Sequence, residues 1–421
     1  MQQCSVSDTT MPHRLGTVVL TVTDDAGQPL GDTEVVVRQR SHAFAFGNIG
    51  FDFIGLANGS GGAGDAALAE RWLALFNTAT LPFYWDGFEP EPGAPRTAEL
   101  HAAAAWFAAR EVRLKGHPLV WHTLAPRWLL DLPLAEVEFR LRARVRREVS
   151  TFRGLIDTWD AINEVVIMPV FDAEDNAITR FTRARGRFAA VRLAFEEARA
   201  ANPSATLLIN DFDLSPAYEC LIEGLLEAGI VPDTIGLQTH MHQGYRGEEA
   251  ILAIVDRFAR YGLPLHFTET SLVSGDVMPP EIVDLNDYVV DSWPSTEAGE
   301  ARQADELVRH YRSLLSHPAV ASITYWGITD AGAWLGAPIG LVRADGSPKP
   351  SYDALHALIK GEWWLRPTRL RTDRDGRVGI TGFLGEYAVE LPATGPAATF
   401  GIAESGDRRH EVRLSLHGQR P

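Results

Sequence analysis

Between residues 43 and 360, short apolar runs rich in β-branched and aromatic residues alternate with longer stretches whose apolar positions recur at helical spacing. The stretches at 134–151 and 179–201 are typical of amphipathic helices. Strands that alternate with helices indicate a parallel sheet, and eight such units indicate a closed barrel. The eight runs that predict strands are 43–47, 75–80, 114–121, 158–164, 206–211, 234–240, 265–269 and 322–327. The fold class is therefore α/β, a (β/α)8 TIM barrel over residues 43–362.

The two ends of the chain follow a different pattern. Residues 17–22 and 34–38 are β-branched runs on either side of the turn-forming segment 24–29, which predicts a hairpin. After residue 366 the helical period disappears, and short apolar runs return between glycines up to about residue 418. We expect the terminal segments, 1–42 and 363–421, to join in one small accessory β domain.

Two of the predicted barrel strands end on a glutamate, Glu164 and Glu269. They are 105 residues apart, which corresponds to three βα units of roughly 30–35 residues each. The spacing places them on the fourth and seventh strands, at the C-terminal face where TIM barrels carry their active sites. Two carboxyl groups held by rigid strands across one sugar–sugar bond are the arrangement of a glycosidase.

The expected roles of the two glutamates differ. Glu164 would be the general acid and base, and Glu269 the nucleophile that forms a covalent glycosyl-enzyme. In that case the carboxyl groups lie about 5–5.5 Å apart, the pKa of the acid is raised, and the nucleophile stays ionised. The alternatives are a carboxylate that caps a helix for Glu164 and a surface carboxylate paired with arginine for Glu269.

Polar residues next to these strand ends extend the candidate site. Asn163 is placed to bind the sugar 2-hydroxyl, Gln238 to bind another hydroxyl, and His240 to orient Glu269 in its ionised form. His240 and His242 also have the spacing of a metal pair, but no carboxylate cluster accompanies them.

Two histidines and two tryptophans follow other predicted strands. Because side chains alternate along a strand, His117 and His122 are expected on opposite faces, with His122 donating to a sugar hydroxyl and His117 in the core. Trp326 and Trp334 follow the last predicted strand and suit the apolar face of a pyranose. The alternative for both tryptophans is core packing.

Composition excludes several classes of partner. The net charge of −16 disfavours binding to nucleic acid or anionic lipid, and no apolar run approaches about 20 residues, so we expect no membrane span. The two cysteines, Cys4 and Cys220, leave a disulfide possible in principle but form no zinc motif. The first residues contain no leader pattern, so we expect a cytoplasmic protein, or a secreted or periplasmic one if a leader has been removed.

Seven segments in the same order resemble glycoside hydrolase family 10, the xylanase family. They are 115–128, 159–164 (WDAINE), 208–213 (LINDFD), 235–240 (IGLQTH), 267–270 (FTET), 325–334 (YWGITDAGAW) and 341–352. The resemblance implies a retaining mechanism on a carbohydrate substrate with no cofactor or metal. It implies Glu164 as acid/base and Glu269 as nucleophile. The implied substrate contacts are His122, Asn163, Asn210, Gln238, His240, Trp326 and Trp334.

One segment departs from that family. Residues 76–80 match it, but the glutamate, asparagine and lysine that normally follow are replaced by the sequence LPFYW at 81–85. These changes remove charged groups that hold sugars on the non-reducing side of the cut, and they add an aromatic wall. We expect Tyr84 and Trp85, with Phe83, to recognise a decorated sugar or an apolar aglycone such as that of a plant glycoside. A second departure is Asp213, where the family usually has asparagine, and a third is the pair Thr270 and Ser271, where it usually has leucine and aspartate.

Two further classes remain open. One is a carbohydrate-binding barrel that has lost catalysis, since a fold alone does not give function. The survival of both glutamates and of Asn163 argues against it. The other is a metal-dependent hydrolase that uses His240 and His242, which loss of activity in chelator would reveal.

Overall fold

The computed structural model describes residues 2–5, 11–392, 397–405 and 407–413. The chain divides into two compact units. One unit contains residues 1–45, 315–318 and 353–421, and the other contains residues 46–314 and 319–352.

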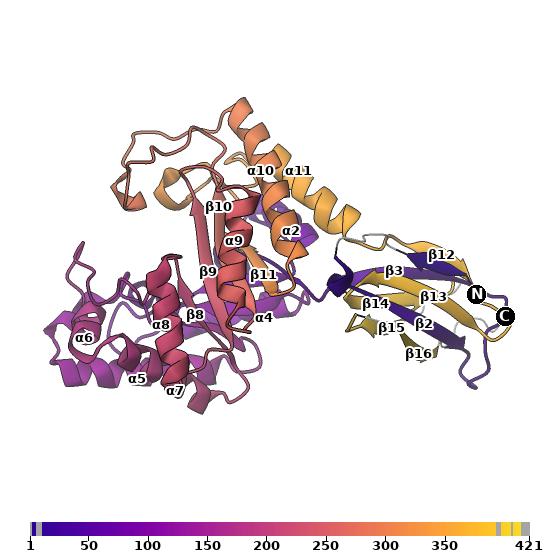
Figure 1. The fold of residues 1–421 in the computed structure, drawn as a ribbon, viewed down its shortest axis with the longest axis horizontal. Helices are drawn as coiled ribbons and strands as arrows, with labels where there is room; N and C mark the ends of the chain where they lie inside the picture. Colours follow the sequence, from indigo (N-terminus) through magenta and orange to yellow (C-terminus); the bar gives the residue numbers. More distant parts are fainter. Residues whose placement is uncertain (1, 6–10, 393–396, 406, 414–421) are drawn as a thin grey trace. The chain divides into compact units, whose positions relative to one another are not determined.

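The larger unit is built on a closed parallel barrel of eight strands, in the order β10-β11-β4-β5-β6-β7-β8-β9 (Figure 1). The strands are β4 Ala45–Ile49, β5 Thr78–Pro82, β6 Arg113–His117, β7 Thr158–Asn163, β8 Thr206–Asp211, β9 Thr234–Met241, β10 Leu265–Leu272 and β11 Val320–Tyr325. The prediction of a (β/α)8 barrel is confirmed. Most strand boundaries differ from the predicted ones by one to three residues. At the C-terminal ends, the largest differences are those of β6, which stops at His117 instead of residue 121, and of β10, which continues to Leu272.

Helices follow the strands and cover them (Figure 1). In α5, the residues Val137, Leu141, Val145 and Val149 recur every four positions and are all buried, which explains why this stretch forms a helix with one face on the sheet. The main helices of this unit are α2 Ala63–Leu75, α4 Thr97–Ala108, α5 Leu134–Thr151, α6 Ala177–Arg185, α7 Arg187–Ala201, α8 Pro216–Glu227, α9 Glu248–Ala259 and α10 Glu297–Ser316. The short helix α11, Pro350–Ala357, follows the last barrel loop.

The smaller unit contains two four-stranded sheets, with the orders β1-β13-β2-β16 and β12-β3-β14-β15. The strands are β1 Gln3–Ser5, β2 Leu15–Thr23, β3 Glu34–His42, β12 Thr368–Arg371, β13 Arg377–Phe383, β14 Gly385–Glu390, β15 Ala397–Ile402 and β16 Asp407–Arg413. Each sheet therefore combines strands from both ends of the chain, as the expected accessory domain requires. One hydrophobic core joins the sheets and includes Val18, Leu20, Val35 and Val37.

The predicted N-terminal hairpin is wrong. The strands β2 and β3 pair in different sheets, β2 with β13 and β3 with β12 and β14. Both strands alternate buried and less buried positions, so each has one apolar face to cover. Placing them in facing sheets buries both apolar faces in the same core, whereas pairing alone would not.

Two smaller expectations concern the cysteines and the membrane. Cys4 and Cys220 are both free in the structure, so the disulfide that the sequence left open is not formed. Within the part of the chain that the structure describes, no helix has the length and apolar character needed to cross a bilayer.

Candidate active site

The two glutamates lie at the C-terminal ends of β7 and β10 in the same barrel. Glu164 is the first residue after β7, and its φ of 56° is a left-handed conformation that ends the strand. Its backbone N–H donates to the carbonyl oxygen of Asn210 at 2.7 Å. Glu269 lies within β10 and is 5% exposed.

Three buried amide side chains connect the two carboxyl groups. Gln238 donates from Nε2 to Glu164 Oε1 at 3.3 Å and to Asn163 Oδ1 at 3.1 Å. Asn210 donates from Nδ2 to Asn163 Oδ1 at 2.7 Å and to Glu269 Oε1 at 3.0 Å. The two donors fix the orientation of the Asn163 amide, so its NH2 group faces away from them and is the donor that a ligand would meet.

The position of Asn210 differs from the predicted substrate contact. It is fully buried, and its Oδ1 accepts a hydrogen bond from Thr268 at 2.6 Å. Because both ends of its amide are bonded to protein side chains, Asn210 holds Glu269 from behind and does not reach the cleft.

His240 also orients Glu269, as the sequence led us to expect. Its Nε2 lies 3.1 Å from Glu269 Oε2, and its Nδ1 lies 2.9 Å from Ser271 Oγ. A hydroxyl therefore stands behind this imidazole at the position where an aspartate was expected from the family pattern.

A second histidine lies behind the same carboxylate. His117 Nε2 is 3.9 Å from Glu269 Oε1, and His117 Nδ1 is 2.7 Å from Asp160 Oδ2. The ammonium group of Lys115 lies 2.7 Å from the same Asp160 oxygen. Burial alone would raise the pKa of Glu269, but His117, His240 and Lys115 outweigh it and hold this pKa below its ordinary value of 4.5.

Glu164 is in the opposite electrostatic situation. Burial and the negative charge of Glu269 raise the pKa of Glu164 to about 8, although Trp121 Nε1 opposes this by donating to Glu164 Oε2 at 2.7 Å. The directions expected for the acid and for the nucleophile are both found. Near neutral pH, Glu164 carries a proton to give and Glu269 carries a negative charge, which is the state in which a carboxyl pair can cleave a glycosidic bond.

A third buried carboxyl group, Asp211 at the end of β8, is another candidate for the general acid. Burial raises its pKa to about 7. Its Oδ2 accepts from the backbone N–H of Val166 at 3.0 Å, and its Oδ1 accepts from that of Asp213 at 3.0 Å. Because both oxygens are bonded to the backbone, Asp211 is fixed as part of the loop structure.

Aromatic rings surround the carboxyl pair. The ring of Tyr84 lies 5.6 Å from that of Trp121 and 5.9 Å from that of Phe51. Burial, together with the negative charges of Glu269 and Glu164, raises the pKa of Tyr84 well above its ordinary value, so its phenol stays protonated beside them. Trp326 belongs to the same group of rings, 5.8 Å from Phe51 and 5.2 Å from His117.

Trp334 completes the aromatic surroundings of the site on the side of His240. Its ring lies 5.0 Å from that of His240 and 5.2 Å from that of His242, and the residue is 36% exposed. Trp326 is 8% exposed. Of the two tryptophans, Trp334 therefore offers the more accessible ring to a ligand.

Two predicted contacts lie in the core. His122 is 1% exposed, its ring packs 4.3 Å from that of Phe171, and burial lowers its pKa to about 4. Trp85 is 6% exposed and donates from Nε1 to Glu89 at 3.0 Å. Neither side chain reaches the carboxyl pair, because β6 ends earlier than predicted and Trp85 begins the short helix α3, Trp85–Phe88, which turns its ring inward.

The predicted aromatic wall is reduced to one residue. Phe83 is fully buried, with its ring 4.8 Å from that of Trp159, and Trp85 is in the core as described. Tyr84 alone faces the glutamates. The chain leaves β5 at Pro82 and enters α3 at Trp85, and over this turn Phe83 and Trp85 point into the core while Tyr84 does not.

Sequence reasoning missed four residues of the site. They are Phe51, His117, Trp121 and Asp160. The prediction of a core position for His117 depended on a strand that ran to residue 121, whereas β6 ends at His117 itself. Asp160 lies inside the segment 159–164, and its spacing of four from Glu164 was the signal available for it.

One residue of the alternative metal site is engaged otherwise. His240 bonds Glu269 and Ser271. His242 is different, because both of its ring nitrogens are buried without a hydrogen bond to any described residue, and burial lowers its pKa to about 3. Over the described ranges, no group of three or more His, Cys, Asp or Glu residues has the geometry to hold a metal ion.

A parallel barrel that holds a protonated and an ionised carboxyl group among amides and aromatic rings at its C-terminal end is a glycosidase of the TIM-barrel class. Residues 76–358 match the family model described as Glycosyl hydrolase family 10. The chain belongs to glycosyl hydrolase family 10, so the resemblance seen in its motifs is confirmed, and it is a hydrolase of O-glycosidic bonds.

Three similar proteins illustrate this relationship. Endo-1,4-beta-xylanase B of Thermotoga neapolitana is 28% identical over 314 residues, which cover 69% of this chain and 84% of that protein. The anti-sigma-I factor RsgI6 of Acetivibrio thermocellus is 24% identical over 406 residues, covering 90% of this chain but only 45% of that protein. The structure of xylanase 10B from Thermotoga petrophila in complex with xylobiose is 22% identical, with a TM-score of 0.62, and covers 76% of this chain and 94% of that one.

Proposed function

We propose that Glu164 and Glu269 perform a double displacement on a β-glycoside, with Glu269 as nucleophile and Glu164 as acid and then base. The observation that carries this proposal is the opposite shift of the two pKa values, downward for Glu269 and to about 8 for Glu164. A site that only bound sugars would have no need to keep one carboxyl group protonated beside an ionised one.

In the first step, Glu269 attacks the anomeric carbon while Glu164 gives its proton to the departing oxygen, so that the glycosidic bond breaks as the bond to Glu269 forms. In the second step, water attacks the same carbon, gives a proton to Glu164 and releases Glu269. His240 and His117 stabilise the charge of Glu269 before the first step and after the second, when its carboxylate is free. The NH2 group of Asn163 is the proposed donor to the sugar 2-hydroxyl.

The substrate class that we propose is xylan or xylo-oligosaccharides joined by β-1,4 bonds. The family and the names of the relatives support this choice, and the binding of xylobiose to a barrel of the same fold is consistent with it. Gln238, His240, Trp326 and Trp334 are the proposed contacts to the sugars beside Asn163. This chemistry needs no cofactor.

A second candidate is the same chemistry on a plant glycoside or a decorated oligosaccharide. Tyr84 favours it, because a phenol stands beside both glutamates at the departure from the family pattern, where charged groups are expected. Loss of charged donors to sugar hydroxyls weakens discrimination among sugars, while the ring offers an apolar surface.

The experiment that tests the proposal is aryl-glycoside release on a β-xyloside, a β-xylobioside, a β-glucoside and an α-arabinoside, beside soluble xylan. We expect wild type to cleave the xylobioside and xylan. Exchanging Tyr84→Asn should raise kcat/KM on the xylobioside relative to the xyloside by about tenfold if the ring limits binding on the non-reducing side, since one polar contact to a sugar contributes about 1–1.5 kcal/mol.

Trp85→Phe is the matched control, because that ring lies in the core and its exchange should leave the ratio of the two substrates unchanged. If the wild type does not cleave xylan but cleaves another glycoside, the second candidate function, on a plant glycoside or decorated oligosaccharide, is favoured. Affinity for sugars without any turnover would contradict catalysis and support a binding barrel.

The pH dependence should report both carboxyl groups. Activity requires Glu269 ionised and Glu164 protonated, so kcat/KM should fall below the lowered pKa of Glu269 and again above about pH 8. Trp121→Phe removes the N–H that stabilises ionised Glu164, so its pKa should rise and the alkaline limb should move upward by about one unit. An alkaline limb that stays in place would show that another group sets it.

A further inference from the structure

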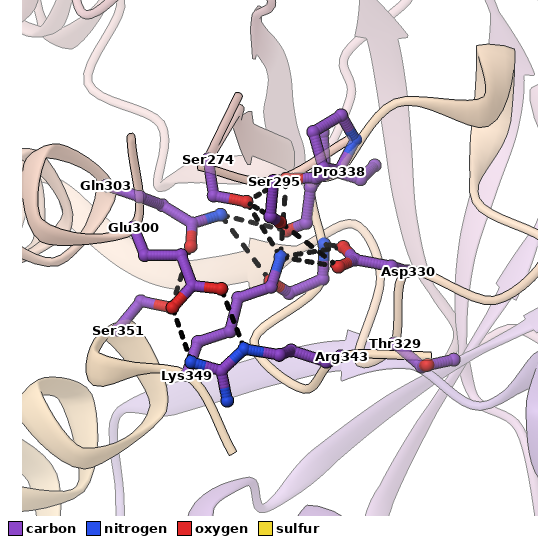
Figure 2. A network of polar contacts seen from close by, with 12 residues as sticks. Ser274, Ser295, Glu300, Gln303, Thr329, Asp330, Pro338, Arg343, Lys349 and Ser351 are labelled. Carbon is purple, nitrogen blue, oxygen red and sulfur yellow. Dashed lines mark hydrogen bonds and ion pairs between the residues drawn. The ribbon is translucent and has the colours of Figure 1, made fainter. Parts of the chain in front are cut away.

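A buried ammonium group joins the two loops that follow β10 and β11 (Figure 2). Lys349 is fully buried, just before α11. Its Nζ donates to Ser274 Oγ at 2.8 Å and to Asp330 Oδ1 at 2.8 Å, and it lies 2.7 Å from Asp330 Oδ2. Ser274 belongs to the loop after β10, and Asp330 to the loop after β11.

The contacts of Lys349 close the loop of residues 330–340 at both ends. At one end, Asp330 binds the ammonium group. At the other end, Gly340 N–H donates to Asp330 Oδ1 at 2.8 Å, and Ser274 Oγ donates to the carbonyl oxygen of Pro338 at 2.8 Å. The Lys349–Asp330 pair and these two hydrogen bonds therefore close the loop together.

The same loop carries Trp334, whose ring lies 5.0 Å from that of His240. The next residue, Leu335, has a φ of 61°, a left-handed conformation that side chains with a Cβ rarely adopt. Such a conformation persists only where the surrounding structure holds it. Ala333 and Leu335 pack against the apolar cluster that contains Met278 and Trp293, and the polar contacts at Asp330, Pro338 and Gly340 close the loop around them.

We propose that Lys349 is a positioning residue for Trp334: through Asp330 it holds the loop of residues 330–340 so that the indole ring stays against His240 and forms one wall of the sugar site. Lys349 acts through Trp334 and touches no substrate. The consequence for a ligand depends on the glycosidase function proposed above, whereas the consequence for the loop does not.

The first test needs no turnover and measures hydrogen exchange in peptides that cover residues 328–342. Lys349→Met keeps the length and the apolar stem of the side chain but removes its charge. We expect at least a tenfold faster exchange in this loop, with little change in the strands of the barrel. Asp330→Asn removes the charge of the pair from the less buried side and should give the same result if Lys349→Met does not fold.

Arg343→Gln is the matched control. Arg343 forms an ion pair with Glu300 in the same network, at 2.8 Å between Nε and Oε1, but among the described residues it forms no hydrogen bond or ion pair with Asp330 or Pro338 (Figure 2). Its exchange should leave the protection of residues 328–342 at the wild-type level. Unchanged exchange in Lys349→Met and Asp330→Asn would overturn the proposal.

The second test separates positioning from stability by a double-mutant cycle with Trp334→Ala. We expect Trp334→Ala to raise KM about tenfold with kcat nearly unchanged, and Lys349→Met to raise KM about fivefold in the same way. The double variant should match Trp334→Ala alone, because Lys349 then has no ring left to position. If the two substitutions raise KM independently, so that their effects multiply in the double variant, the proposal is contradicted. If the wild type shows no turnover at all, the glycosidase function is contradicted, but the result of the hydrogen-exchange test remains valid.

Discussion

Replacing Glu269 by alanine should lower kcat by on the order of 10⁴-fold or more on every substrate, because the first bond to the anomeric carbon can no longer form. Azide should restore part of the activity. A small anion fits the space that the side chain leaves and attacks from the face that Glu269 occupied. The product of a β-glycoside should then be the α-glycosyl azide, with inverted configuration, which can be identified by proton NMR.

Glu300→Ala is the control for this experiment. Glu300 is 7% exposed, similar to Glu269, and it follows β10 in the chain, but it binds Arg343 and not the site. Its loss should lower stability and leave kcat near the wild-type value. Full activity of Glu269→Ala, or a rescue product of β configuration, would contradict the assignment of the nucleophile.

The barrel was predictable because its signal is repeated eight times along the chain. The strand at 206–211 coincides with the observed β8, since a fully buried parallel strand is a continuous apolar run with sharp ends. The strand at 114–121 was predicted too long, because His117 and Pro118 continue an apolar run that no longer pairs as a strand. That single boundary misplaced His122, whereas His117 is buried as expected but also lies beside Glu269.

The accessory strands show what pattern alone does not contain. The two N-terminal runs were correctly found as strands, yet their partners lie more than 300 residues away in the chain. Alternation specifies which face of a strand is buried but not which strand covers it. The sequence pattern therefore predicted that β2 and β3 pair through their connecting turn. In the structure they lie in two different sheets, on opposite sides of one hydrophobic core.

The glutamates were predictable for a different reason: each ends an apolar run, and their separation fits whole βα units. Their surroundings were less so. The aromatic wall was inferred from three adjacent aromatic residues, of which only Tyr84 faces the site, because the chain passes from β5 into α3 at this point and turns Phe83 and Trp85 into the core. The pKa of Glu269 is lowered by His117, His240 and Lys115, and the pKa of Glu164 is raised by burial and by the charge of Glu269. Only the folded barrel brings these side chains together.

Replacing Glu164 by alanine should give a loss that depends on the leaving group. An aryl glycoside with a strongly activated phenol needs little protonation, so its kcat/KM should fall by less than about tenfold, whereas a substrate with a sugar leaving group should lose about 10²–10⁴-fold. The second step also slows, because water has lost its base. Azide needs no base and should release the glycosyl-enzyme as the β-glycosyl azide, the opposite anomer to that from Glu269→Ala.

The rival acid provides the sharpest control, because Asp211 is also buried, with a pKa of about 7. Asp211→Asn disturbs the loop that its oxygens hold and should affect good and poor leaving groups to the same extent. If the loss of kcat/KM depended steeply on the leaving group in Asp211→Asn and were the same for all leaving groups in Glu164→Ala, Asp211 and not Glu164 would be the general acid. Since only a proton donor to the departing oxygen can produce that dependence, the pair of variants identifies the acid whatever sugar the enzyme prefers.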